Sequence, residues 1–325
     1  MDDGTTVSII IPVKPGGRVT ALERLRLLDY PPEQVELTIA EGCWPSRQRN
    51  EAAGGAAGKL LLFLDDDALL TPGYLNRVVA HFTGPRIAVV GGPSLTPPGD
   101  SPFQRTLGIA LASWLGGGGA RNRYRATGGP RETGERELIL CNLAYRRDVF
   151  LSLGGLDERL YPNEENELLD RTGRQGWRLI HDPALAVCRS QRPTYRAFAR
   201  QFFGYGRGRG EQTRIAGVRG VADFIPSLFL LYLCCAALLR HPLGALPLAC
   251  YGAVVVGFSL VEALRAGLPS AGFRLLAIYP ILHFSYGAGL IRGLMAPRFL
   301  RDHGKAPVVT LRRVKPLGAP WPETF

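Results

Sequence analysis

The sequence predicts an α/β domain, with a parallel sheet covered by helices on both faces, followed by α-helical transmembrane segments. Two observations carry this prediction. In the first two-thirds of the 325-residue chain, short apolar runs alternate with helix-forming stretches, as in doubly wound folds. From residue 224 to residue 291 the only formally charged residues are Arg240, Glu262, Arg265 and Arg274, a composition typical of membrane helices.

Four apolar runs near the N-terminus are predicted as strands: residues 7–13 (VSIIIPV), 35–42, 59–64 and 86–92. Between them, helix formers predict helices over residues 20–28, 46–57 and 73–82. Ligands of such sheets bind beyond the carboxyl ends of the strands. Three loops are expected to meet there, at residues 12–17, 41–49 and 65–67.

After Pro93 the alternation of strand-like and helix-like runs becomes less regular. Residues 106–125 are apolar at first and then contain four consecutive glycines and three arginines. This stretch is too short to span a bilayer and is expected to be mobile or interfacial. Residues 137–150 resume as a strand and then a helix. Residues 161–177 predict a helix capped by Asn163, and a strand is expected at 177–183.

Aromatic and basic residues alternate over 194–212, which predicts an amphipathic interfacial helix. Three apolar segments follow, at residues 224–239, 243–261 and 275–291, each near the length needed to span a bilayer. Three crossings would place the basic residues after Arg292 outside, against the positive-inside tendency; the alternative is one re-entrant or interfacial segment. The predicted domains are therefore 1–212, 213–297 and a basic tail over 298–325.

The net charge of +11 is compatible with nucleic acid, anionic lipid or a phosphate-bearing substrate. Much of the excess flanks the apolar region, in Arg207, Arg209, Arg214, Arg219, Arg292, Arg298, Arg301, Lys305, Arg312, Arg313 and Lys315. This placement favours a membrane surface over nucleic acid. The six cysteines form no CxxC pair, and the acidic N-terminus is not a signal peptide. The N-terminal domain is therefore expected in a reducing cytosol.

Three aspartates, Asp65, Asp66 and Asp67, directly follow the apolar run LLLFL. Adjacent carboxylates repel one another, so this triplet requires a compensating partner. A D-x-D pair at a strand end can hold Mg²⁺ or Mn²⁺ together with the oxygens of a phosphate substrate. A solvated acidic turn is the ordinary alternative, and the triplet alone does not decide between the two.

Two acids, Glu164 and Glu165, begin the helix expected after Asn163. A carboxylate in this position can serve as a general base, although acids in a first helical turn are also ordinary dipole partners. Arg49 could clamp a phosphate or be a surface residue. His181 is left open as a neighbour of metal or phosphate. The runs GGGG and GYGRGRG lack the spacing of a phosphate-binding loop.

In their order, these pieces resemble an inverting family 2 glycosyltransferase of the GT-A fold. The matching pieces are VSIIIPV, Glu41-Gly42, Arg49-Asn50, FLDDDALLTPGYL and NEENELLDR, the last resembling an E-D-x-D-L-x-x-R motif. SWLGGGGARNRYR, RPTYRAFARQFFGYGRGR and HFSYGAGLIRG resemble the membrane-bound exopolysaccharide branch, of the succinoglycan glucosyltransferase type.

The resemblance implies a role for each matching residue. Pro12, Val13, Glu41, Arg49, Asp65, Asp66, Gln201 and Arg207 would contact a nucleotide sugar. Asp67, with Asp65, would hold Mg²⁺ or Mn²⁺, and Glu165 would be the catalytic base. Arg189 stands where a His is frequent in the family; whether it or His181 contacts metal or diphosphate stays open.

The function expected from the resemblance is transfer of a sugar from a UDP-sugar to a polyprenyl-linked saccharide, in exopolysaccharide or cell-surface polysaccharide synthesis. The enzyme would be a multi-pass protein of a bacterial-type plasma membrane, with its catalytic domain in the cytosol and no nucleic-acid partner. Two alternatives stay open: transfer directly onto polyprenyl phosphate, and a non-enzymatic scaffold that binds nucleotide sugar. The sugar and the linkage cannot be read from the sequence.

Overall fold

The structure, a computed structural model, describes residues 4–239, 242–300 and 308–322. Arg240, Arg301 and Lys305, which the charge analysis includes, lie outside the described residues. The chain forms two compact units, and neither is continuous in sequence. The first comprises Met1–Leu95, Arg125–Arg189 and His303–Phe325; the second comprises Thr96–Tyr124 and Ser190–Asp302.

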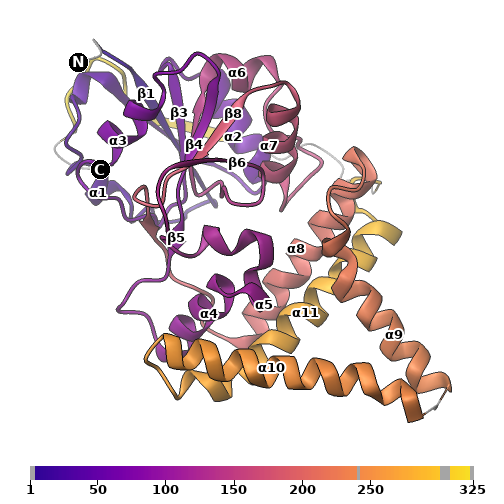
Figure 1. Cartoon of the computed structure of the whole chain (residues 1–325). Helices are drawn as coiled ribbons and strands as arrows, with labels where there is room; N and C mark the ends of the chain where they lie inside the picture. The colour runs from indigo at the N-terminus through magenta and orange to yellow at the C-terminus, as the bar shows by residue number, and fades with distance from the viewer. Residues whose placement is uncertain (1–3, 240–241, 301–307, 323–325) are drawn as a thin grey trace. The chain divides into compact units, whose positions relative to one another are not determined.

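An eight-stranded sheet forms the centre of the first unit (Figure 1), in the order β10-β2-β1-β3-β7-β4-β8-β6. Its strands are β1 (Val7–Val13), β2 (Val35–Glu41), β3 (Leu60–Leu64), β4 (Ile87–Gly91), β6 (Arg131–Thr133), β7 (Asn142–Arg146), β8 (Arg178–His181) and β10 (Thr310–Lys315). A separate pair joins β5 (Ser94–Leu95) to β9 (Val187–Cys188). The helical segments are α1 (Leu22–Leu25), η1 (Pro32–Gln34), α2 (Pro45–Gly54), α3 (Tyr74–His81), α6 (Arg147–Ser152) and α7 (Glu164–Arg174).

The sheet is mixed, whereas the sequence predicts only parallel strands. β1 runs parallel to β2 and β3, and β4 runs parallel to β8. β7 lies antiparallel between β3 and β4, and β6 and β10 are antiparallel at the two edges. An apolar run shows that a strand is buried but carries no information on its direction, which is why β7 could not be assigned.

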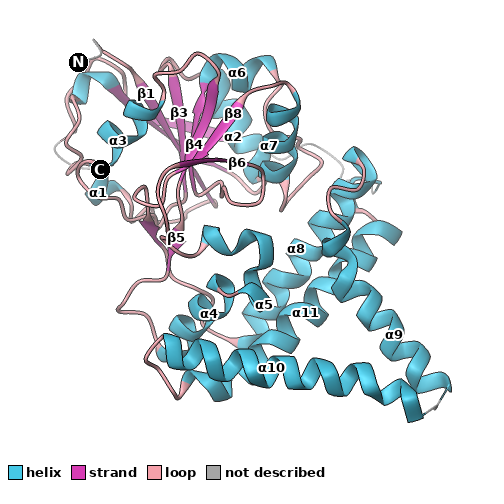
Figure 2. Cartoon of the chain, in the orientation of Figure 1, coloured by secondary structure: helices cyan, strands magenta, loops and turns pink. Residues whose placement is uncertain are grey.

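Helices cover both faces of this sheet, as predicted (Figure 2). Successive residues of β1 alternate between two apolar clusters: Ile9 and Ile11 belong to the cluster that includes residues of α1 and α3, whereas Ile10 belongs to the cluster with α2, α6 and α7. β3 divides its side chains in the same way. A strand buried on both faces must be apolar at every position, and this explains the runs VSIII and LLLFL.

The second unit is helical. Its segments are α4 (Pro102–Ala112), α5 (Trp114–Gly117), η2 (Gly118–Arg123), α8 (Tyr195–Ala216), η3 (Val221–Phe224), α9 (Ile225–Leu239), η4 (Pro242–Ala245), α10 (Leu246–Arg265), α11 (Ala271–Met295) and η5 (Arg298–Leu300). Among the residues that the structure describes, three stretches are long and apolar enough to cross a membrane: Val221–Leu238, Leu246–Arg265 and Ala271–Leu300. This confirms the three predicted apolar helices.

Several local expectations need correction. Only Leu22–Leu25 of residues 20–28 is α-helical. Most of residues 106–125 lie in short helices of the second unit, and the interfacial position expected for them stays a prediction. Ser101 opens the first of these, α4, with a capping box to Gln104. Asn163 precedes α7, but its side chain makes no cap hydrogen bond; it adopts a left-handed conformation with φ of 89°. Asn tolerates this conformation better than most residues.

Glycines allow α8 and α11 to pack with their backbones in contact. On α8, Gly206 and Gly210 face Tyr286, Leu290 and Gly293 of α11; on α11, Gly289 and Gly293 face Phe203 and Arg207 of α8. A Cβ atom at any of these four glycines would collide with backbone atoms of the opposite helix. The run GYGRGRG is therefore a helix-packing element, consistent with its mismatch to a phosphate-binding loop.

This packing predicts that Gly289→Leu destabilises the protein, because no flexible side chain can move aside to admit the new atoms. Overpacking of this kind costs about 1–3 kcal/mol or more. Gly257→Leu is the matched control, since Gly257 lies on α10 with open space around its Cα. Thermal unfolding in detergent should show a lower Tm for Gly289→Leu than for Gly257→Leu. Equal Tm values would contradict the packing.

Candidate active site

The loops after β1 and β2 are tied together at the carboxyl edge of the sheet. The Gly42 amide donates to Val13 O (2.9 Å), and the Gly16 amide donates to a carboxylate oxygen of Glu41 (3.1 Å). Gln48 strengthens the junction by donating from Nε2 to Val13 O (2.9 Å) and to Ala40 O. Val13 and Glu41 are thus brought together as predicted, and Pro12 precedes Val13 in the same strand. The sequence did not single out Gln48.

Two arginines neutralise the aspartates after β3. Arg49 on α2 lies 3.2 Å (Nη2) from Oδ1 of Asp65. Arg189, directly after β9, bridges two carboxylates, with Nη1 3.0 Å from Oδ2 of Asp65 and Nε 3.1 Å from Oδ1 of Asp67. The partner that the triplet requires is therefore, in this structure, a pair of guanidinium groups. The sequence marks Arg189 as a departure from the family pattern and leaves its contact with metal or diphosphate open; it does not predict the pairing with Asp65 and Asp67.

Asp66 differs from its two neighbours. Its carbonyl accepts hydrogen bonds from the Ala21 amide (3.0 Å) and from Thr20 Oγ1 (3.2 Å), which fixes the turn that carries the triplet. Burial, followed by repulsion from Asp67 and Asp65, raises the pKa of its carboxyl. The backbone of Asp66 thus has a clear structural role, and its contact with a nucleotide sugar stays a prediction.

Arg49 also connects the aspartates to α7. Its guanidinium is buried, and Nη1 lies 3.6 Å from Oε1 of Glu164, the first residue of α7. A continuous chain of ionisable side chains therefore runs from Asp67 through Arg189, Asp65 and Arg49 to Glu164. The sequence motifs that carry these residues lie far apart, and the sheet edge brings them together.

Glu164 is a buried carboxyl group whose pKa is raised to about 8, by burial first and then by repulsion from Glu165, with Arg49 opposing the shift. Its Oε2 has no hydrogen-bond partner within the part of the chain that the structure describes. The next residue, Glu165, lies in the first turn of α7 and is only partly buried. Of the two acids, Glu165 is the more accessible to a reacting group, as a general base must be.

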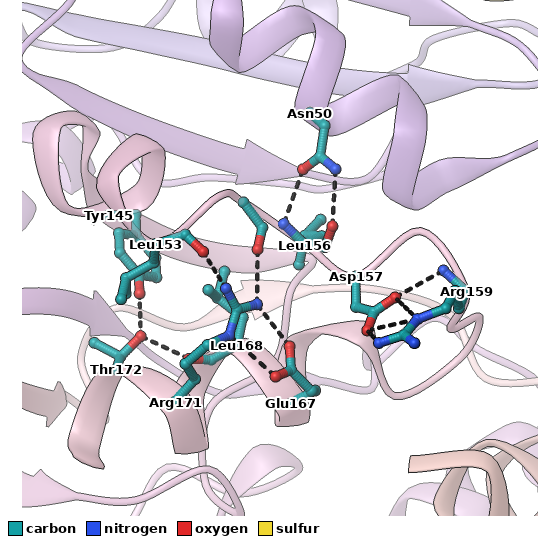
Figure 3. A network of polar contacts seen from close by, with 11 residues as sticks. Asn50, Tyr145, Leu153, Leu156, Asp157, Arg159, Glu167, Leu168, Arg171 and Thr172 are labelled. Atoms are coloured by element: carbon teal, nitrogen blue, oxygen red, sulfur yellow. Dashed lines mark hydrogen bonds and ion pairs between the residues drawn. The ribbon is translucent and has the colours of Figure 1, made fainter. Parts of the chain in front are cut away.

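A polar network fixes the start of α7 against α2 (Figure 3). Asn50, next to Arg49, clamps the backbone of Leu156 by donating to its carbonyl (2.8 Å) and accepting from its amide (2.9 Å). Arg171 pairs with Glu167 (2.7 Å) and donates to the carbonyls of Gly155 (2.9 Å) and Leu153. The motif's Glu167 and Arg171 thus act as positioning residues, and the Asn of the Arg-Asn pair does the same.

The residues present fit a cation that is shared with a phosphate ligand. Mg²⁺ is commonly held by one or two carboxylates together with substrate phosphates, and Asp65 and Asp67 supply two carboxylates. Within the described ranges, no group of three or more His, Cys, Asp or Glu side chains is placed to hold a metal ion. A cation held by Asp65 and Asp67 would complete its coordination with water or with phosphate oxygens of the substrate.

The remaining predicted residues lie elsewhere. His181 is buried at the end of β8, and the structure leaves its role open. The neighbouring Asp182 binds Arg77 (2.6 Å) and His81 (2.7 Å); burial would raise its pKa, but these hydrogen bonds outweigh burial and lower it. Gln201 and Arg207 lie on α8 in the second unit, and their contact with a nucleotide sugar stays a prediction.

The raised pKa of Glu164 predicts a pH-dependent stability. Because its folded-state pKa of about 8 exceeds the ordinary value of about 4.3, the stabilising contribution of the protonated carboxyl is full below about pH 4 and is lost as the pH rises through 8. Glu164→Gln does not titrate, so its Tm should fall less than that of the wild type between pH 5.5 and pH 8.5. Exposed Glu23→Gln serves as the control; an unchanged pH profile in Glu164→Gln would refute the assignment.

Comparison with known proteins agrees with this geometry. A family model described as "Glycosyl transferase family group 2" matches residues 60–291. The succinoglycan biosynthesis protein ExoA of Rhizobium meliloti (strain 1021) is 28% identical over 246 residues, which cover 74% of this chain and 71% of that protein. The pre-mycofactocin glycosyltransferase of Mycobacterium tuberculosis is 25% identical over 167 residues, covering 47% of this chain and 31% of that protein.

Among solved structures, the mannosyltransferase PcManGT from Pyrobaculum calidifontis, in complex with GDP-Man and Mn²⁺, has a TM-score of 0.54 at 16% identity and covers 90% of this chain and 88% of that one. At this identity the likeness concerns the fold. The family match spans most of the chain, and it includes the D-x-D aspartates and the start of α7. The chain therefore belongs to the family 2 glycosyltransferases and has the GT-A fold, as the resemblance in its sequence predicted.

Proposed function

We propose that this glycosyltransferase transfers a sugar from a UDP-sugar to a polyprenyl-linked saccharide at a membrane, with inversion at the anomeric carbon. The chain of ionisable side chains from Asp67 to Glu164 carries the proposal, because it joins the D-x-D aspartates to the helix that bears Glu165. A site for this reaction requires cationic groups near a departing diphosphate and a base near the attacking hydroxyl. Both kinds of residue lie at the carboxyl edge of one sheet.

The proposed roles follow from placement. Glu165 takes the proton from the acceptor hydroxyl, whose oxygen forms a bond to the anomeric carbon as the bond to the nucleotide diphosphate breaks. Arg49 and Arg189 pair with the aspartates and would exchange them for phosphate oxygens, which guanidinium groups bind well, once a cation occupies the carboxylates. Pro12, Val13 and Glu41 border the site for the nucleotide. Mg²⁺ or Mn²⁺, held by Asp67 and Asp65, would supply positive charge for the leaving diphosphate.

The comparisons support the coarser parts of this proposal. ExoA is described as a protein of succinoglycan biosynthesis, which favours a saccharide acceptor. The structure of PcManGT was solved with GDP-Man and Mn²⁺, which favours a divalent metal in this site. For the same reason, a GDP-sugar is tested beside UDP-sugars as the donor. The three helices that are long and apolar enough to cross a membrane favour a lipid-linked acceptor. The plasma membrane of a bacterium, with the catalytic unit in the cytosol, is the proposed location.

Glu165→Gln should lower turnover by about 100-fold or more, because the substitution removes the base and preserves the shape of the side chain. Binding of the nucleotide sugar should stay close to that of the wild type, since the amide neither adds bulk nor breaks the chain of ion pairs. The measurement is sugar transfer by the purified full-length protein in detergent. UDP-sugars and GDP-mannose are each assayed with Mg²⁺, Mn²⁺ or a chelator.

Asp170→Asn is the matched control, because Asp170 lies on the same helix and pairs with exposed Arg174 at 3.1 Å. It should retain wild-type turnover. Near wild-type turnover of Glu165→Gln would exclude the assigned role. Two acceptors are compared: a polyprenyl-linked saccharide, and polyprenyl phosphate without a saccharide. Transfer to polyprenyl phosphate alone would favour the alternative acceptor. NMR of the product should show that the configuration at the anomeric carbon is inverted.

A further inference from the structure

The second unit's apolar helices are inserted between two parts of the same sheet. β1 through β9 precede them in sequence, and β10 follows them. β10 pairs antiparallel with β2, from Thr310 opposite Glu41 to Lys315 opposite Leu37. The chain therefore leaves the first unit after Arg189, passes through α9, α10 and α11, and returns to the sheet that it left.

Specific contacts anchor this returning strand. Lys315 is buried and donates from Nζ to the carbonyls of Val35 and Pro32. Arg313 donates to Gly55 O (3.0 Å). Trp321 packs against the apolar cluster that includes Ile9 and Ile11, and it lies 5.3 Å from Nζ of Lys315. β10 is thus an integral edge of the sheet, and its position is set by side-chain contacts as well as by strand pairing.

A hydrogen-bonded sheet of this kind lies on one side of a bilayer, because an open sheet cannot be threaded through hydrocarbon. A chain segment that connects two strands of one sheet must therefore begin and end on the same side of the bilayer. It crosses the bilayer an even number of times. Three candidate spans cannot all cross. The sequence between Leu300 and Thr310 contains Arg301, Asp302 and Lys305 and is shorter than the roughly 20 apolar residues that a further span requires.

We propose that the chain enters and leaves the bilayer on the face of the first unit, with α9 and α10 as the inserted hairpin and α11 held at that face. The partner of the hairpin is the hydrocarbon of the bilayer. This proposal concerns membrane topology and is independent of the donor, the acceptor and the role of Glu165.

The packing of α11 against α8 identifies α11 as the helix that stays outside the hydrocarbon. The two helices run side by side through the contacts of Gly206, Gly210, Gly289 and Gly293. α8 carries six charged residues: Arg196, Arg200, Arg207, Arg209, Glu211 and Arg214. Charged side chains are costly in hydrocarbon, so a helix joined to α8 along its length is excluded from spanning.

Hydrogen bonds made by charged side chains add to this argument at the C-terminal end of α11. Glu211 of α8 is fully buried and accepts a hydrogen bond from the Arg298 amide (2.9 Å) just after α11. Arg214 of α8 donates to Leu294 O (2.8 Å). These are charged groups in contact with the apolar helix itself, and they place this end of α11 in a polar environment.

Exposure separates α9 and α10 from α11. Only 6% of the first candidate span and 17% of the second is buried within the protein, against 39% of the third. Large apolar side chains remain exposed on both hairpin helices: Ile225, Leu228, Leu231 and Leu238 on α9, and Leu246, Leu248, Val254, Val256 and Leu260 on α10. Bare apolar surface of this extent is what a bilayer covers.

The arginines follow the same topology. With α9 and α10 inserted, Arg219 before α9 and both Arg265 and Arg274 around the α10 to α11 connection lie on the face of the first unit. Inserting α10 and α11 instead would place Arg265 and Arg274 on the far side. Arginine favours the cytoplasmic side of membrane segments, and a cytosolic first unit satisfies that preference with the first arrangement.

Labelling of single cysteines with a membrane-impermeant maleimide tests the topology in the full-length protein. The parent replaces Cys43, Cys188, Cys234, Cys235 and Cys250 and keeps Cys141, whose burial raises the pKa of its thiol to about 12 and leaves it inert. Three proteins are compared in oriented membrane vesicles: one with Cys43 restored to report the first unit, Ser270→Cys between α10 and α11, and Ala245→Cys at the apex. Positions 43, 245 and 270 are all exposed.

The expected result is that Cys43 and Ser270→Cys are labelled from the same side of the vesicle and that Ala245→Cys is not labelled from that side. Labelling of the apex from the far side, or only after detergent is added, supports the inserted hairpin. Ser270→Cys labelled on the face opposite Cys43, or Ala245→Cys labelled together with Cys43, would overturn the proposal. Retained glycosyltransferase activity or an unchanged size-exclusion profile confirms that each variant is folded.

Discussion

The site depends on how the protein balances three consecutive carboxylates at the end of a buried strand. Asp65 and Asp67 would repel each other and any approaching phosphate if they stood alone. Arg189 forms ion pairs with both carboxylates. Arg49, on α2, forms an ion pair with Asp65 and also lies close to the carboxyl group of Glu164. One charged chain therefore sets the electrostatics of the sheet edge. Guanidinium groups also attract phosphates, so the arginines that neutralise the aspartates can also bind the diphosphate of a nucleotide sugar.

The rest of the first unit supports that chain. Burial of β3 on both faces fixes the position of the aspartates that follow it. Arg49 lies on α2 next to Asn50, which binds the backbone of the segment before α7. Glu167 and Arg171 then hold α7 so that Glu164 faces Arg49. The acidic residues of the motif thus have two kinds of role. Glu164 faces Arg49 in the site, whereas Glu167 pairs with Arg171 and holds α7 in position. Substitution of either kind would disturb the reaction by a different route.

The sequence was sufficient to predict the alternating strands and helices and the apolar helices, because each follows from a local pattern of apolar and charged residues. The family was predicted because several motifs, in their order, resemble those of known members. Strand direction was missed for β7, and β10 was assigned to a basic tail, since Lys315 and Arg313 read as surface charges until their pairing with β2 is seen. Arg189 could not be matched to Asp65 and Asp67 because a contact across 122 residues leaves no local trace. Glu164 was underrated beside Glu165, since its burial depends on the packing of α7.

The most direct test of this account is the Mn²⁺ affinity of the full-length protein without nucleotide, measured by electron paramagnetic resonance. A cation bound by Asp65 and Asp67 competes with Arg189 for the same oxygens. Arg189→Met should therefore bind Mn²⁺ more tightly than the wild type, by roughly tenfold if the ion pairs contribute about 1.4 kcal/mol. Arg174→Met removes an exposed arginine from α7 and should leave the affinity unchanged. Equal or weaker Mn²⁺ binding by Arg189→Met would contradict the claim that arginine and metal share the D-x-D carboxylates.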